Sequence, residues 1–235
     1  MASSPLQIPP LSFALVSPGV YRSGCPMPLN FPFLARLRLK SIIYLADQDL
    51  PADLQQFTAE NGVHVFHFRV HHARDAEDTD ATSTANDDTL GDSGYENLTA
   101  PASPDGKGED ERKKKKKKKK EDKQNNLRVV ENDAESVTQA LELLLDSRNF
   151  PVLIHSNKGK HRSGVLVACM RKSLQNWAFG SVKSEYHYFA GEKGKADIEF
   201  IEQFRPTLEY DERWAPDWMR ESPGESALVK VIKAA

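Results

Sequence analysis

Apolar residues recur with two different periods along the chain, and the two periods alternate. Short apolar runs, typical of buried strands, occupy Ser41–Leu45, Val63–Val70 and Pro151–His155. Between the first two runs, Leu50–Gly62 has a proline near its start and a glycine at its end, as a helix often does. Strands interleaved with helices predict an α/β fold with a central sheet flanked by helices.

Four helices are expected in the second half of the chain. Apolar residues at helical spacing from Val137 to Leu145 predict an amphipathic helix, and Asn132 and Glu135 suggest a capping box at its start. Another helix is expected from about Ser163 to Gln175, directly after the third strand. Two more follow, and their apolar faces would contain Val182, Tyr186 and Phe189, then Ile198, Ile201 and Phe204.

The residues between the second and third strands include a segment of different composition. From Asp75 to Gln124 the chain is polar, and it contains eight consecutive lysines, Lys113–Lys120. Such a segment cannot bury enough apolar surface to offset the entropy of ordering it, so we predict a disordered insertion over 75–126. The sequence thus predicts one domain over 8–205, interrupted by this insertion, and a C-terminal extension over 206–235.

Composition excludes several classes of protein. The 235 residues carry a net charge of -2, and the stretch from Asp75 to Lys123 holds 14 acidic and 11 basic residues, so the rest is almost neutral. The lysine run is flanked by acidic residues and lacks interleaved aromatics, which argues against nucleic-acid binding. The longest apolar runs are too short to span a membrane, and the first residues do not resemble a signal peptide, so we expect a cytoplasmic protein without a membrane partner.

Metal and disulfide chemistry are not expected either. Cys25 and Cys169 lie in unrelated contexts, which predicts neither a disulfide framework nor a zinc site. Four histidines cluster in and after the second strand, but strand alternation separates them onto two faces. No acid or cysteine accompanies them at ligand spacing, so we predict no metal and no cofactor. These histidines are His64, His67, His71 and His72.

The loop that leaves the third strand carries the candidate chemistry. It reads HSNKGKHRSG over 155–164 and leads into a helix. Backbone N–H groups in a turn at a helix N-terminus form a cradle for anions, and an arginine in the first helical turn can grip two phosphate oxygens. Glycine allows a backbone conformation that larger residues resist. The loop therefore predicts phosphate binding through Asn157, Lys158, Gly159, Lys160, His161 and Arg162.

This loop closely resembles the His-Cys-x5-Arg-[Ser/Thr]-Gly signature of the cysteine-dependent tyrosine and dual-specificity phosphatases, with Ser156 in place of the cysteine. A second segment, YRSGCP at 21–26 followed by Pro28, Asn30 and Phe31, is similar to a motif of the plant and fungal atypical dual-specificity phosphatases. Within that family, the chain is most similar to the fungal oxidant-induced cell-cycle arrest proteins, which are linked to stress. The resemblance covers roughly 8–75 and 127–205.

The resemblance implies a single dual-specificity-phosphatase-like domain and assigns roles to five residues. Ser156 takes the nucleophile position, Arg162 binds phosphate, and Ser163 assists breakdown of the intermediate. His155 would support the loop by hydrogen bonds, and Asp75 is the general-acid candidate by its order along the chain. A solvated charge at the edge of the insertion is an equally good interpretation of Asp75.

Two functions remain open at this point. The chain could be a phosphoester phosphatase, acting on phosphorylated proteins or inositol (pyro)phosphates with little or no activity, because serine is harder to deprotonate than cysteine. Alternatively, it could be a pseudophosphatase subunit or scaffold that assembles with related phosphatase-like proteins. The similar subgroup itself carries serine at this position, which favours natural divergence over an engineered Cys→Ser substitution at Ser156.

Overall fold

The computed structural model describes residues 7–69, 132–192, 194–220 and 229–231. The predicted insertion, Asp75, the lysine run, His71 and His72 lie outside these residues. The elements at the start of the chain are β1 (Ala14–Ser17), β2 (Val20–Gly24), η1 (Pro28–Asn30), α1 (Phe31–Leu37), β3 (Ser41–Leu45), α2 (Ala52–Glu60) and β4 (His64–Phe68).

The elements in the second half of the chain begin at Ala134. They are α4 (Ala134–Leu144), η2 (Ser147–Asn149), β5 (Val152–Ser156), α5 (His161–Ser173), α6 (Phe179–Ala190), α7 (Lys195–Gln203), β6 (Leu208–Tyr210), η3 (Glu212–Trp214), α8 (Asp217–Arg220) and β7 (Val229–Val231). None of the helices in the described part of the chain is long and apolar enough to cross a membrane.

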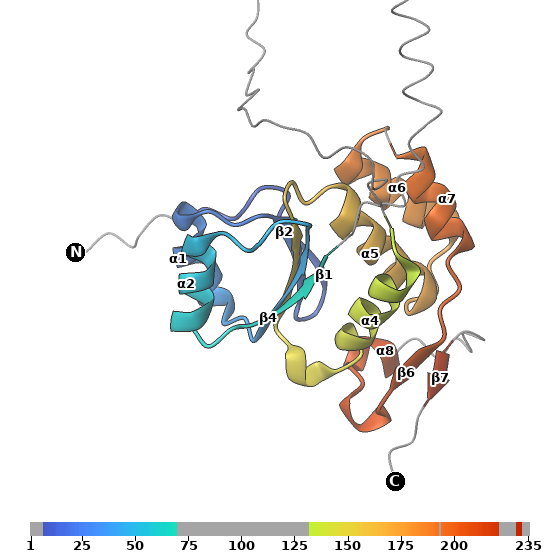
Figure 1. Cartoon of the computed structure of the whole chain (residues 1–235). Helices are drawn as coiled ribbons and strands as arrows, with labels where there is room; N and C mark the ends of the chain where they lie inside the picture. The colour runs from blue at the N-terminus through green and yellow to red at the C-terminus, as the bar shows by residue number, and fades with distance from the viewer. Residues whose placement is uncertain (1–6, 70–131, 193, 221–228, 232–235) are drawn as a thin grey trace, which may run out of the picture. The chain divides into compact units, whose positions relative to one another are not determined.

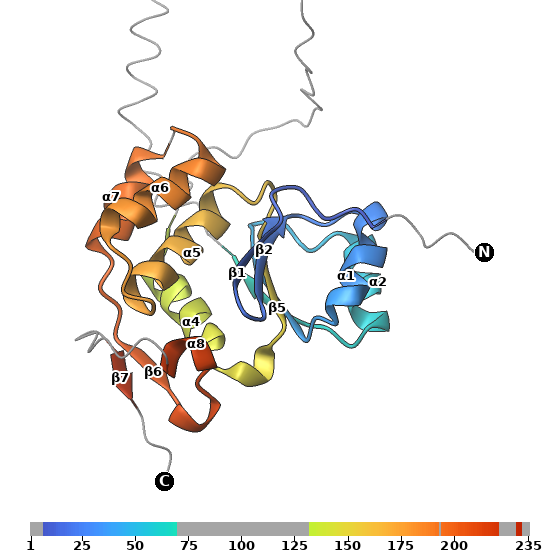
Figure 2. The same cartoon turned by 180° about the vertical axis from the view of Figure 1, so that it is seen from behind.

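Five strands form the central sheet in the order β1-β2-β5-β3-β4. All neighbours in this sheet are parallel except β1 and β2. Figure 1 shows α1 and α2 on one side of the sheet and α4, α5, α6 and α7 on the other, and Figure 2 shows the same layers from behind. The predicted α/β fold with a helix-flanked central sheet is confirmed.

Each face of the sheet packs on its own apolar core. Residues of β3 alternate between the two cores, with Ile43 in the core beneath α4 and α5 and Ile42 in the core beneath α1 and α2. The strand β5 contributes in the same way, with Ile154 on the first face and Leu153 on the second. Because β5 is buried on both faces and lies in the middle of the sheet, the loop that leaves its carboxyl end has a rigid support.

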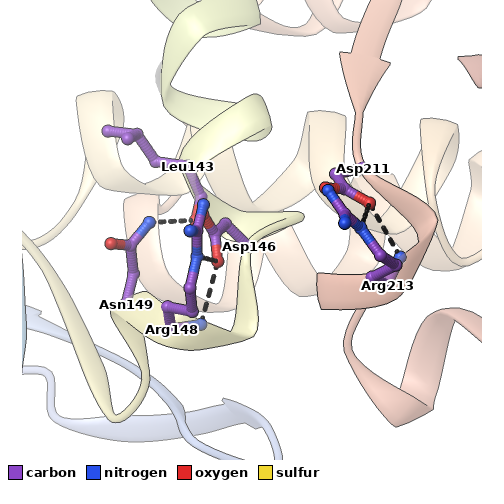
Figure 3. Close-up of polar contacts among 6 residues, drawn as sticks. All are labelled: Leu143, Asp146, Arg148, Asn149, Asp211 and Arg213. Atoms are coloured by element: carbon purple, nitrogen blue, oxygen red, sulfur yellow. Dashed lines mark hydrogen bonds and ion pairs between the residues drawn. The ribbon is translucent and has the colours of Figure 1, made fainter. Parts of the chain in front are cut away.

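Two short 3-10 helices, η2 and η3, are each capped by an aspartate that also pairs with an arginine (Figure 3). Asp146 caps η2 and pairs with Arg148, with 2.6 Å between the closest carboxylate oxygen and guanidinium nitrogen. Asp211 caps η3 and pairs with Arg213 at the same distance. Asn149 also donates to the carbonyl of Leu143, at 2.9 Å. The contacts of Asp146 and Asn149 fix the turn that leads from α4 into β5, and the Asp211–Arg213 pair fixes the turn between β6 and α8.

The predicted capping box of α4 is wrong. The residue that caps this helix is Asp133, whose carboxylate accepts hydrogen bonds from the N–H groups of Glu135 and Ser136. Asn132 instead donates from its side-chain amide to Asp197 of α7, at 2.8 Å. A carboxylate acceptor one residue closer to the helix satisfies the same N–H groups, which frees Asn132 for a tertiary contact.

Candidate functional site

The loop between β5 and α5 is pressed against the end of β2. Gly159 lies in this loop with a φ of +67°, in the left-handed region that favours glycine. A Cβ atom at Gly159 would lie 2.4 Å from the backbone nitrogen of Gly24 and 2.5 Å from the carbonyl carbon of Ser23. The position therefore requires glycine for two reasons, its conformation and its contact with the neighbouring strand.

Three consecutive carbonyl groups of the loop are held by donors from the N-terminal part of the chain. The backbone N–H of Cys25 donates to the carbonyl of Asn157 at 3.1 Å, and the Ser12 hydroxyl lies 3.5 Å from the carbonyl of Lys158. The third carbonyl, of Gly159, accepts a 2.9 Å hydrogen bond from the guanidinium of Arg22. All three carbonyls thus face β2 and the segment that precedes β1.

This arrangement turns the following N–H groups towards the inside of the loop. In a planar trans peptide, the C=O of one residue and the N–H of the next point in opposite directions. The N–H groups of Lys158, Gly159 and Lys160 are therefore directed away from β2. One of them is anchored on the inner side, since the N–H of Gly159 donates to the Ser156 hydroxyl at 3.2 Å. The N-terminus of α5 follows, so the loop forms a cradle suited to an anion.

The Ser156 hydroxyl lies at the bottom of this cradle. The residue is 5% exposed, and its Oγ lies 3.3 Å from the Oγ of Ser163 on the first turn of α5. Its other contact is the Gly159 N–H, which donates and cannot take a proton. Within the described residues, the hydrogen bonds of Ser156 thus include no basic group.

Arg162 faces a carboxylate that the sequence did not single out. Its guanidinium lies 2.8 Å from the carboxylate of Asp47, which follows β3 at the same edge of the sheet. The Asp47 segment is held in turn by Arg69 at the end of β4, which donates to the carbonyl of Asp47 at 2.9 Å and pairs with Asp49. The cation predicted to bind phosphate is therefore partly neutralised by an acid from a neighbouring strand.

His161 is held by buried side chains of α6 and α7. Its Nδ1 lies 2.9 Å from the hydroxyl of Tyr186 and 3.1 Å from the carboxylate of Asp197. Tyr186 also donates to Asp197, which is 3% exposed and accepts the hydrogen bond from Asn132. Because Nδ1 contacts this carboxylate, the ring ties the start of α5 to α6, α7 and the start of α4.

His155 supports the loop differently from the expectation. Within the described residues, neither ring nitrogen has a hydrogen-bond partner. The ring instead stacks on Tyr44 of β3, with 4.7 Å between centroids, and Tyr44 stacks on His67 of β4. Burial, with a smaller contribution from nearby His67, lowers the pKa of His155 to about 3, so the ring is neutral near pH 7. The support that the described structure shows is packing across three strands.

The remaining predicted residues have simpler positions. Asn157, Lys158 and Lys160 are exposed on the loop. Cys169 is buried in the core, and Cys25 is half buried beside the loop, where burial raises the pKa of its thiol. In the part of the chain that the structure describes, His, Cys, Asp and Glu side chains nowhere gather in a group that could hold a metal ion.

Comparisons with known proteins give a consistent result. The model of the tyrosine phosphatase family matches residues 7–221. Inositol diphosphatase DSP4 of Arabidopsis thaliana is 34% identical over 85% of this chain and 74% of its own length. The tyrosine-protein phosphatase-like protein OCA2 of Saccharomyces cerevisiae is 32% identical over 91% of this chain and 83% of its own.

A solved structure shares the fold. The core catalytic domain of the PP-IP phosphatase SIW14 from S. cerevisiae, in complex with citrate, is similar with a TM-score of 0.58 and 28% sequence identity. The similarity covers 85% of this chain and 88% of that domain.

Proposed function

Because this chain belongs to the tyrosine phosphatase family, we propose that it binds phosphate groups in the loop from Ser156 to Arg162 and hydrolyses them slowly or not at all. The observation that carries this proposal is the direction of the loop carbonyls. All three are turned towards the N-terminal segment, so three N–H groups are directed into the cradle before a ligand arrives. Preorganised N–H donors bind an anion without a cost of reorganisation.

The proposed ligand carries more than one phosphate and is of the inositol pyrophosphate class. Lys158 and Lys160 are exposed on the loop, where they can contact a second phosphate beyond the one in the cradle. The plant relatives that are about one third identical to this chain are inositol diphosphatases. A phosphorylated protein is the other ligand to test, since the family model is that of tyrosine phosphatases.

The weak activity that we propose follows from the chemistry of Ser156, which the resemblance of the loop places at the position of the family's nucleophilic cysteine. Attack by its hydroxyl would form an O–P bond, break the bond between phosphorus and the leaving oxygen, and release a proton that needs a base. A cysteine is deprotonated with a pKa of about 8.5, lower near a helix N-terminus, whereas serine needs an adjacent base. The described contacts of Ser156 are Ser163 and the Gly159 N–H, and neither is a base.

Phosphate release from an inositol pyrophosphate and from a phosphotyrosine peptide tests the proposal. We expect slow or undetectable release by the natural chain, a gain of at least about a hundredfold for Ser156→Cys, and loss of that gain when Arg162→Ala is added. Binding of the inositol pyrophosphate is measured in parallel by calorimetry. The proposal is wrong if the natural chain binds none of the three ligands, which are the inositol pyrophosphate, the phosphopeptide and inorganic phosphate.

The same experiment addresses a purely binding role. If Ser156→Cys binds the ligand as tightly as the natural chain but shows no turnover, the site lacks more than its nucleophile. The chain would then be a phosphate-binding pseudophosphatase, which could assemble with related phosphatase-like proteins. For that alternative, we expect the chain to co-purify with such proteins, and we expect substitutions at Ser156 to leave this co-purification intact.

A further inference from the structure

Arg22 is a charged residue inside the apolar core. It lies on β2 opposite Ile154 of β5 and is 1% exposed. Its guanidinium lies over the ring of Phe189 on α6, with 3.8 Å from Cζ to the ring centroid. Burial lowers the pKa of Arg22 to about 10, partly offset by nearby Glu185. The side chain therefore stays charged at neutral pH in a place where an apolar residue would be expected.

The contacts of Arg22 do not explain it as a packing residue. Its Nε has no hydrogen-bond partner within the described residues, and one of its terminal nitrogens donates to the carbonyl of Gly159. Burying a guanidinium is costly, and an apolar side chain of similar size would avoid that cost, although the carbonyl of Gly159 would then lose its donor. These two effects oppose each other, so stability alone gives little reason for an arginine at this position.

The contact with Gly159 lies directly behind the anion cradle. The peptide unit that offers its carbonyl to Arg22 presents the N–H of Lys160 on its opposite side, towards the inside of the loop. A charged donor on the carbonyl also polarises the peptide, which makes that N–H a stronger donor to an anion. Arg22 is too deeply buried to reach the ligand itself.

We propose that Arg22 is a positioning residue for the phosphate-binding loop. It holds the Gly159 carbonyl towards β2, so that the N–H of Lys160 points at the bound phosphate. The proposal rests on the proposed function of the loop. Arg22 acts through the backbone, so its removal weakens anion binding without removing any group that touches the anion.

The test compares anion affinity with stability in Arg22→Met. Inorganic phosphate is titrated into the full-length chain, with the backbone amide resonance of Lys160 followed by NMR, and unfolding by urea is measured without phosphate. We expect phosphate to bind about ten- to a hundredfold more weakly, the factor that a charge-assisted hydrogen bond provides. The urea midpoint should change little or rise, and Arg22→Lys, which keeps a charged donor, should recover part of the affinity.

Arg171→Met is the matched control. Arg171 is also buried and lies over an aromatic ring, with 4.2 Å from Cζ to the centroid of Trp177, and it binds Glu185 through two hydrogen bonds. It does not contact the loop in the described structure, so its replacement should lower stability and leave phosphate affinity unchanged.

The outcomes separate this proposal from the proposed function. If the natural chain binds none of inorganic phosphate, the inositol pyrophosphate and the phosphopeptide, the proposed function fails. If it binds phosphate and Arg22→Met binds equally well, or if Arg171→Met weakens binding to the same extent, the positioning role is overturned. Should Arg22→Met not fold, Arg22→Gln replaces it, because its amide is shorter and uncharged, and a larger loss of affinity than in Arg22→Lys is expected.

Discussion

Replacement of Gly159 by alanine should disable the loop and destabilise the domain. The backbone has a φ of +67°, which costs an alanine about 1–2 kcal/mol. The new Cβ would also lie 2.4 Å from the backbone nitrogen of Gly24 and 2.5 Å from the carbonyl carbon of Ser23, both of which belong to a central strand and cannot simply rotate away. Overpacking of this kind costs about 1–3 kcal/mol more. We therefore expect the free energy of unfolding to fall by about 2–5 kcal/mol.

Gly62→Ala separates the two contributions. Gly62 has nearly the same φ, +63°, but apart from its chain neighbours no heavy atom lies within 4 Å of the position its Cβ would take. Its replacement should cost only the conformational part, about 1–2 kcal/mol. Unfolding by urea, followed by circular dichroism, gives both values, and calorimetry with inorganic phosphate gives the affinity of the loop. Phosphate binding should be lost in Gly159→Ala and retained in Gly62→Ala.

The reasoning is refuted if the two alanine variants lose the same stability, or if Gly159→Ala still binds phosphate as the natural chain does. Either result would mean that the loop moves away from β2 at little cost, and that its contact with this strand does not set its shape.

Three further predictions concern residues around the site and the core. Asp47→Asn should raise the affinity for inorganic phosphate by about three- to tenfold, because a carboxylate no longer competes for the loop arginine; Asp49→Asn, in the same segment, should change it less, and calorimetry compares the two. His155→Phe should reduce the loss of stability in acid. The pKa of His155 is about 3 in the folded chain against an ordinary value of 6.5, so the unfolded chain binds a proton first as the pH falls. The free energy of unfolding therefore decreases between pH 6.5 and 3, by about 1.4 kcal/mol per pH unit for this group. Urea unfolding of the natural chain and of His155→Phe at pH 6.5 and 4.5 measures this loss. An equal fall in the free energy of unfolding in both proteins would contradict the prediction. Lys172 donates to three carbonyls at the end of α7, so Lys172→Met should lower the free energy of unfolding by about 1–2 kcal/mol, whereas exposed Lys183→Met should not.

The strands and helices with a clear period were predictable from the sequence, and those at the N-terminus were not. The run Ser41–Leu45 is a strand with the predicted bounds. The strand Val20–Gly24 was missed because Arg22 occupies a position that faces the core, which interrupts the apolar pattern of a buried strand. The short helix Phe31–Leu37 was missed as well, because its proline and aromatic residues are poor helix formers.

The loop residues could be identified from their spacing, but their partners could not. Gly159, Arg162 and Ser163 lie within a few residues of one another, so a local pattern reveals them. Asp47 and Arg22 reach the loop from other strands, and a single sequence does not contain the pairing of strands that brings them there. Asp75 lies outside the described residues, so its role as general acid stays a prediction.

The way in which the loop is built separates affinity from selectivity. Its inward donors are backbone N–H groups, fixed by contacts on the far side of the peptide chain, whereas the side chains of Asn157, Lys158 and Lys160 project into solvent. Exchanging these three side chains should therefore change which phosphorylated molecules bind to the loop without altering how the phosphate group itself is held. An engineer could retarget the loop by surface substitutions alone, and natural drift at these positions could do the same.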